Sequence, residues 1–497
     1  MSSQNPGVSY CEEEPDLVDL ASSRYGGEVV WCSDEFFAAS ANLVAPSAPV
    51  WREEEFTDHG KWMDGWETRR RRDQGHDSCI IRLGLPGIVN RVTVDTSHFT
   101  GNYPESFSLD ACGVPTERLD EAEWVEVLPR TRLEGDRVAV FEVGETHRAT
   151  HVRLNIYPDG GVARLRVDGE PIPAMDQVCP DEGLIDLARA TLGAVCTEAS
   201  DAHFSSPANL ISPTDPEGMW DGWETARRRG PGHDWAIVDL GLPGTVHRFE
   251  VDTRHFKGNA PGWVDLDVAR HGADWTPACQ RVSVEAHSVN RIDLAQPVEA
   301  DRVRLNIHPD GGVARLRVWG RPIPASAARL RIRYLDSLFD QEAASFFSTA
   351  CASGAWVERM MDLRPFGEAA AVLDAADRAF EGLSGDDWLE AFAAHPRIGD
   401  RAGRQSRAGE AMSRHEQAGV DPNDAGELDD MNRRYEDKFG FTYIVRAAGR
   451  SGQEMLELAR QRLDNDRHTE IEVAAGQQRE ITMLRLRRML CLSQEET

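Results

Sequence analysis

The sequence contains a long internal duplication, and this feature constrains the fold more than any other. Three blocks of residues from the first third of the chain return in the second third, in the same order and with few changes. The pairs are residues 62–71 and 219–228, residues 98–102 and 255–259, and residues 153–167 and 304–318. Because long segments return in the same order, the duplication predicts that the first two thirds of the chain form two copies of one domain.

Each copy alternates apolar and polar residues in the manner of half-buried β-strands. Val152, Leu154 and Ile156 are separated by Arg153 and Asn155, which places the apolar side chains on one face of an antiparallel strand. Glycine and proline interrupt these runs at short intervals, and long helical patterns are absent from both copies. We therefore expect two tandem all-β modules, each a β-sandwich.

The apolar spacing becomes helical after a proline-bounded, alanine-rich stretch at residues 324–329. Trp388 and Phe392 lie on one helical stripe, and Ser384 can cap this helix together with Asp387. Gly440 stands where another helix should end. These patterns predict an all-α domain after the β-modules. The expected parts are an N-terminal tail at 1–20, β-modules at 21–175 and 176–328, and a helical domain at 334–493.

Composition and charge exclude several classes of protein. The 497 residues include 84 acidic and 55 basic side chains, and a net charge of −29 would repel nucleic acid. No apolar run is long enough to span a membrane, and the acidic start does not resemble a signal peptide. The nine scattered cysteines argue for reduced thiols. We expect a cytoplasmic protein without nucleic-acid or membrane partners, and homo-oligomer formation stays open.

The His395-Pro396 step should end a helix and present an imidazole in a turn, because a residue before proline is pushed out of helical geometry. Farther along, Ser413, Glu416 and Gln417 share one helical face. Such a face can hold a polar, urea-like ligand, and His395 with Glu416 can supply an acid and a base near neutral pH. The spacing also fits a plainer interpretation, in which His395 caps a carbonyl group and the other side chains are solvated.

These motifs resemble 2-oxo-4-hydroxy-4-carboxy-5-ureidoimidazoline (OHCU) decarboxylase over roughly residues 335–490, with matches at 395–399, 413–417 and 435–445. The resemblance implies that His395 donates a proton and that Glu416 helps to expel the substrate carboxylate. The implied decarboxylation needs no cofactor, because the substrate ring carries its own electron-withdrawing groups. The resemblance further implies a set of residues that bind the substrate: Pro396, Ser413, Gln417, Tyr443, Ile444, Val445 and Ala447.

The repeated string Trp-x-Asp-Gly-Trp-Glu-Thr, with its arginine cluster and the Gly-His-Asp that follows, resembles allantoicase over about residues 20–325. That family hydrolyses allantoate to ureidoglycolate and urea. The resemblance implies that each β-sandwich is a jelly-roll of the galactose-binding-like type. Allantoate carries one carboxylate and two ureido arms, so its site should offer a guanidinium, polar groups for the urea N–H bonds, and an acid. The repeated loops supply these candidates: Glu67, Arg70, His76, Asp77 and His98 in one copy, and Glu224, Arg227, His233, Asp234 and His255 in the other.

Several alternatives stay open from the sequence. Trp66 and Trp223 are expected in the core, and the arginine runs are either solvated or functional. The His-Asp pairs either orient each other or hold a divalent metal ion, so metal dependence is unknown. The sequence does not indicate which of the two copies carries the active site.

The main hypothesis is a bifunctional enzyme of urate and allantoin degradation that acts on two small ureides, allantoate and OHCU. One alternative is a β-module pair that binds a ligand or assembles without catalysis. The other is a helical domain that has lost its activity.

Overall fold

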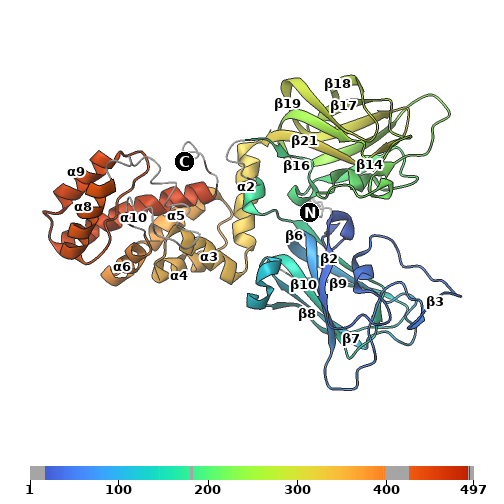
Figure 1. The fold of residues 1–497 in the computed structure, drawn as a ribbon, viewed down its shortest axis with the longest axis horizontal. Coiled ribbons are helices and arrows are strands. Elements are labelled where there is room, and N and C mark those ends of the chain that lie inside the picture. Colours follow the sequence, from blue (N-terminus) through green and yellow to red (C-terminus); the bar gives the residue numbers. More distant parts are fainter. Residues whose placement is uncertain are drawn as a thin grey trace, which may run out of the picture. The chain divides into compact units, whose positions relative to one another are not determined.

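The computed structural model describes residues 17–144, 146–178, 183–395, 397, 425–490 and 492. These residues form a β unit, which includes everything described up to Ile323 except residues 175–178, and a helical unit (Figure 1). The helical unit contains α1 (Met175–Val178) and the described residues from Pro324 onward. The stretch at 324–329, expected as a boundary, is the first part of helix α2 (Pro324–Ser337).

The first repeat is organised by one long strand, β6 (Asp77–Asp95), in which nearly every second residue is buried. This strand pairs with four others, β2, β9, β10 and β12, and the sheet continues through β7 and β8 on one side and β1 on the other. The strands are β1 (Val18–Asp19), β2 (Glu28–Cys32), β3 (Phe56–Thr57), β4 (Gly60–Lys61), β5 (Trp66–Glu67), β7 (Ser106–Cys112), β8 (Val125–Arg132), β9 (Val138–Glu142), β10 (Arg148–Tyr157), β11 (Gly161–Val162) and β12 (Arg164–Pro171).

The second repeat reproduces this topology, with β16 (Asp234–Asp252) in the place of β6. Strand β19 (Val289–His308) pairs along most of the length of β16 and covers the positions of both β9 and β10. The other strands are β13 (Ile185–Asp186), β14 (Val195–Ala199), β15 (Trp223–Glu224), β17 (Trp263–Ala269), β18 (Thr276–Ser283), β20 (Gly312–Val313) and β21 (Arg315–Pro322).

The alternation seen in the sequence directs the apolar side chains into the core of each repeat. Val152, Leu154 and Ile156 on β10 are fully buried, whereas Arg153 between them contacts Asp110 on the neighbouring strand. The prediction of two all-β modules is therefore confirmed.

The helical unit is also as predicted, and its local sequence signals act at the expected residues. Ser384 caps α6 (Gly385–Ala393) and forms a reciprocal capping box with Asp387. Gly440 follows α8 (Ala425–Phe439) in the left-handed conformation. Trp356 and Phe392 lie in its apolar core. The helices after α2 are α3 (Asp340–Ala350), α4 (Gly354–Asp362), α5 (Ala369–Ala379), α6 (Gly385–Ala393), α8 (Ala425–Phe439), α9 (Gly452–Arg462) and α10 (Arg467–Met489). None of the described helices has both the length and the apolar character of a membrane span.

A buried arginine links the motif loop to the sheet in both repeats. Arg315 donates to a carboxylate oxygen of Asp221 at 2.8 Å and to the backbone carbonyl of Thr214 at 3.0 Å. Arg164 makes the same pair with Asp64 at 2.9 Å. Because charged groups are buried only when they are paired, this contact positions the loop relative to the strand.

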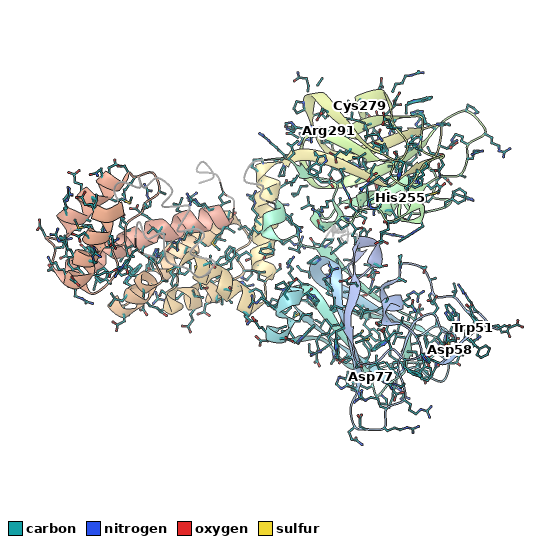
Figure 2. All side chains as sticks on the ribbon, in the orientation of Figure 1. Trp51, Asp58, Asp77, His255, Cys279 and Arg291 are labelled. Carbon is teal, nitrogen blue, oxygen red and sulfur yellow. The ribbon has the colours of Figure 1, made fainter. Side chains whose placement is uncertain are left out.

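We expect Arg315→Ala to lower the free energy of unfolding of the β unit by about 3–5 kcal/mol, because the Asp221 carboxylate would be left buried without its partner. The matched control is Arg291→Ala, which removes an exposed partner of Asp293 (Arg291 is labelled in Figure 2). That change should leave the free energy of unfolding nearly unchanged, because the pair is exposed to solvent. Urea denaturation of the full chain measures both, and equal losses would contradict the structural role of Arg315.

Candidate functional site

The three repeated blocks meet at one place in each β-module. In the first repeat, β5 pairs with β11, so that Glu67 lies opposite Gly161. The backbone N–H of Gly161 donates to the carbonyl of Asn102 at 2.7 Å, which brings the second block, residues 98–102, beside the other two. Trp66 is fully buried and its indole N–H donates to the carbonyl of Asp34 at 2.7 Å. Trp66 is therefore a core residue that holds the loop.

The three blocks pack closely around one phenylalanine ring. Phe99 is fully buried, and a Cβ atom at Gly161 would lie 2.0 Å from its ring. A Cβ atom at Gly65 would lie 2.9 Å from the same ring and 2.6 Å from the carbonyl oxygen of Val162. Both glycines are thus required by close packing against Phe99, which explains their place in the repeated blocks.

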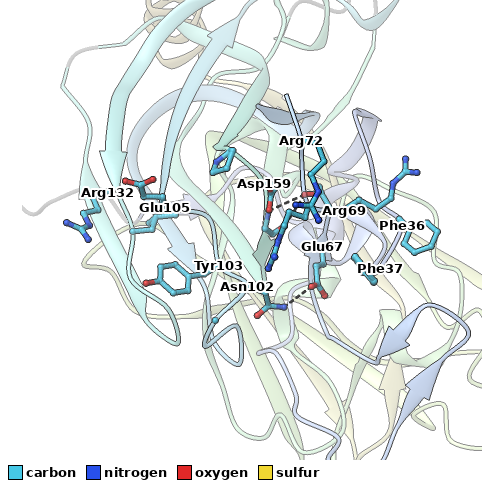
Figure 3. A pocket seen from close by; sticks show the side chains of 16 residues that line it. Phe36, Phe37, Glu67, Arg69, Arg72, Asn102, Tyr103, Glu105, Arg132 and Asp159 are labelled. Atoms are coloured by element: carbon cyan, nitrogen blue, oxygen red, sulfur yellow. Dashed lines mark hydrogen bonds between the residues drawn. The ribbon is translucent and has the colours of Figure 1, made fainter. Parts of the chain in front are cut away.

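A cavity of about 810 Å³ opens where the blocks of the first repeat meet (Figure 3). Its volume falls within the range of small-molecule sites. The wall combines both signs of charge with a few aromatic rings. The residues that line it are Phe36, Phe37, Glu67, Thr68, Arg69, Arg70, Arg72, Gly101, Asn102, Tyr103, Glu105, Arg132, Leu133, Pro158, Asp159 and Gly160.

Four guanidinium groups line this cavity, in a chain with a net charge of −29. Arg69 pairs with Asp34 at 2.7 Å. Among the described residues, no protein group forms a hydrogen bond or ion pair with the guanidinium groups of Arg70, Arg72 and Arg132. Guanidinium groups that keep their donors unused are suited to bind the carboxylate of a ligand.

Glu67 provides a carboxyl group in the same cavity. The amide of Asn102 donates to Glu67 Oε1 at 2.7 Å, as Figure 3 shows. Burial raises the pKa of Glu67, and the hydrogen bond from Asn102 opposes this shift. A carboxyl group with a raised pKa holds a proton closer to neutral pH and is suited to donate it to a leaving group.

The other candidates of the first repeat lie elsewhere. Asp77 is buried, forms an ion pair with Arg71 at 2.6 Å and accepts a hydrogen bond from Ser33. His76 packs on the ring of Tyr157 and lines a separate cavity of about 300 Å³. His98 lies near the ring of Trp51, with 5.8 Å between ring centroids. The structure therefore brings Glu67 and Arg70 to one cavity, and Asp77, His76 and His98 to other places.

The second repeat keeps the same framework. The amide of Asn259 donates to Glu224 Oε1 at 2.6 Å, and Trp223 is a core residue whose indole N–H donates to a carbonyl. Asp234 is buried and pairs with Arg228. Among the remaining candidates, Arg227 is exposed, as is its counterpart Arg70. His233 packs on His308, and His255 contacts the carbonyl of Pro216 at 2.9 Å.

Asn102, Tyr103 and Arg132 are among the cavity residues that were absent from the sequence candidates. Asn102 belongs to a repeated block and could have been included on that ground. Tyr103 directly follows that block, and Arg132 ends β8 outside any repeated block. Arg132 reaches the cavity because β8 pairs with β7, opposite Ser106, and no local signal in the sequence gives that register. Within the described part of the chain, no group of three or more His, Cys, Asp or Glu is arranged to hold a metal ion.

In the helical unit, His395 lies just beyond the end of α6 and is half-buried. Burial is the main cause that lowers its pKa to about 4, and the positive charge of Arg485 on α10 acts in the same direction. The side chain of Gln478 on α10 opposes the shift. The imidazole is thus neutral at pH 7 and faces a guanidinium. The expected partners Pro396, Ser413, Glu416 and Gln417 lie outside the described residues.

The backbone segment expected to bind the substrate is held by a buried network. Tyr443, Ile444 and Val445 are buried, and Ala447 packs against the apolar core. Arg462 on α9 donates to the carbonyl of Ile444 at 2.7 Å and pairs with the fully buried Glu470 at 2.6 Å. Because this ion pair is buried, it orders the segment after α8.

We expect the pKa of His395 to rise toward 6.5 in Arg485→Gln, because a nearby positive charge that disfavours the imidazolium is removed. NMR titration of the His395 ring measures this, with Arg488→Gln, an exposed arginine of the same helix, as the control. Because the pKa of the folded state is lowered, the unfolded chain binds this proton more readily, and stability falls as the pH drops from 6.5 to about 4. A wild-type pKa near 6.5 would contradict the burial of this group.

Comparisons with known proteins agree with the division of the chain into a β unit and a helical unit. Residues 18–172 and 185–323 match the family model of the allantoicase repeat, and residues 336–487 match that of OHCU decarboxylase. A probable allantoicase of Photobacterium profundum is 44% identical over 317 residues, which cover 61% of this chain and 96% of the relative. A probable allantoicase of Pseudomonas paraeruginosa is 45% identical over 319 residues, with the same coverage.

Among solved structures, the allantoicase of Saccharomyces cerevisiae matches with a TM-score of 0.54 and 35% identity, over 62% of this chain and 94% of that protein. The two family models together span most of the chain in the order expected from the sequence motifs. The chain therefore belongs to the allantoicase family, carries an OHCU decarboxylase domain after its two repeats, and is an enzyme of purine degradation.

Proposed function

We propose that this protein catalyses two reactions: hydrolysis of allantoate to ureidoglycolate and urea in the β unit, and decarboxylation of OHCU to (S)-allantoin in the helical unit. The observation that carries the first assignment is the cavity of the first repeat. There, guanidinium groups with no partner among the described residues line the same space as a partly buried carboxyl group. The product of one reaction is a closed ring and the substrate of the other is an open-chain acid, so a separate ring-opening hydrolase must act between them.

Allantoate matches this cavity in charge and in hydrogen bonding. Its carboxylate needs a guanidinium such as that of Arg70 or Arg72, and its two ureido arms offer N–H groups that carboxylates accept. Asp159 and Glu105 provide such acceptors in the wall. The departing urea needs a proton, and Glu67 is the carboxyl group whose pKa is raised.

The decarboxylase assignment is supported by the surroundings of His395. An anionic substrate bound beside Arg485 would neutralise part of the charge that lowers the pKa of His395. The imidazole would then take a proton from solvent as the substrate binds. Loss of carbon dioxide leaves an electron pair on the ring carbon, and His395 would transfer its proton to that carbon.

We expect the full-length protein to release urea from allantoate and to consume OHCU. His395→Asn should reduce OHCU decarboxylation by about 10²–10⁴-fold, because the proton donor is lost, while urea release stays unchanged. Measurement of both reactions on the same preparations provides the control, since urea release reports that the β unit is folded and an unchanged thermal midpoint of unfolding reports that the helical unit is folded. Allantoate binding without urea release would instead favour a non-catalytic β unit, and unchanged OHCU turnover in His395→Asn would rule out its role.

A further inference from the structure

The arginine cluster around the cavity of the first repeat is only partly reproduced in the second. The motif blocks of the two repeats are offset by 157 residues, so that Arg69 corresponds to Ala226. The other three arginines of the run are kept, as Arg227, Arg228 and Arg229. The second repeat thus lacks one of the guanidinium groups that line the cavity of the first.

The opposite wall differs as well. Arg132 on β8 lies opposite Ser106 on β7 in the sheet. The equivalent opposite residues in the second repeat are Ser283 on β18 and Trp263 on β17. No guanidinium therefore stands at this position of the second repeat. Two further residues of the cavity wall have smaller counterparts in the second repeat: Tyr103 corresponds to Ala260 and Glu105 to Gly262.

The first repeat also carries an insertion. Asn42 and Asn209 are equivalent, since each amide donates to the carbonyl of a motif glycine, Gly65 at 3.0 Å or Gly222 at 2.8 Å. The two asparagines are 167 residues apart and the two glycines 157. Ten extra residues therefore lie between Asn42 and Gly65, and this segment includes the hairpin of β3 and β4.

The hairpin supports the wall of the cavity. His59 stacks on the ring of Phe36 at 4.1 Å between centroids, and the guanidinium of Arg69 lies 5.3 Å from the same ring. The ammonium group of Lys61 lies 4.6 Å from the ring of Trp51, which is labelled in Figure 2. Phe36 and Arg69 both line the cavity, so the insertion orders a wall for which the second repeat has no equivalent segment.

From these differences, we propose that allantoate is hydrolysed in the first repeat alone, where Arg132 binds the substrate carboxylate and Glu67 protonates the departing urea. The proposal rests on the allantoate hydrolysis proposed above and adds its location. Arg132 is suited to this role because its guanidinium has no protein partner among the described residues and lies in the cavity wall that contains Glu67.

The reaction balances with water as the only other reactant. The bond between the central carbon of allantoate and one ureido nitrogen breaks, and the nitrogen takes the proton of Glu67 to become neutral urea. Water adds its hydroxyl group to the carbon, and its remaining proton returns to the Glu67 carboxylate. Asn102, which donates to Glu67 at 2.7 Å, holds the carboxyl group in place through this cycle.

The decisive experiment compares Glu67→Gln with Glu224→Gln in the full-length protein, by the rate of urea release from allantoate. Each substitution removes one carboxyl group that accepts from an asparagine amide in an equivalent position. Glu67→Gln should lower kcat by about 10²–10⁴-fold, and it should abolish the part of the pH dependence of kcat that is due to the Glu67 carboxyl group. Glu224→Gln should leave kcat unchanged. OHCU turnover and the thermal midpoint show that both variants are folded.

A second comparison tests the carboxylate site. Arg132→Ser introduces the residue of the second repeat and should raise KM for allantoate by about 10–100-fold, because one charge-assisted hydrogen bond is lost. Arg137→Ser, an exposed arginine of the same repeat, should leave KM unchanged.

The possible outcomes distinguish an error in the proposed location of the site from an error in the proposed reaction. Urea release that survives in Glu67→Gln, or is lost equally in Glu224→Gln, would overturn the assignment to the first repeat while the reaction stands. No urea release by the wild-type protein would overturn the reaction itself. An unchanged KM in Arg132→Ser would remove this residue from the site.

Discussion

The packing of a phenylalanine ring against two glycines is the contact on which each β-module depends. Phe99 in the first repeat and Phe256 in the second are fully buried, and a Cβ atom at Gly161 or Gly312 would lie 2.0 Å from the ring. This contact brings three loops, distant in the sequence, to one place. The hydrogen bond between Asn102 and Glu67 is a result of that approach.

Much of the fold could be predicted from local signals, because strand alternation, helix caps and the duplication are all contained in short segments. The site could be predicted only in part. Glu67 and Arg70 are found from the repeated string, since their loop is part of it. Arg132 depends on the register between two strands, and Arg485 meets His395 across ninety residues of chain. Contacts of this kind arise from tertiary packing, which no local pattern records.

The two units use a similar electrostatic arrangement on unrelated folds. In the β unit, arginines line the same cavity as Glu67, whose pKa is raised by burial. In the helical unit, burial and the charge of Arg485 both lower the pKa of His395. The chain as a whole carries a net charge of −29, so a group of arginines around a cavity concentrates positive potential in an otherwise acidic protein. Small anions are attracted to such a place, while large polyanions meet a repulsive surface.

The buried pairs Arg164–Asp64 and Arg315–Asp221 are the same in both repeats, whereas the residues around the cavity differ. The framework and the cavity wall have thus changed independently since the duplication. The second module keeps the same buried framework, so loops taken from its sibling would find matching attachment points there. Protein engineers could use it to build a chain with two ureide-cleaving centres, or to graft a different specificity beside the existing one.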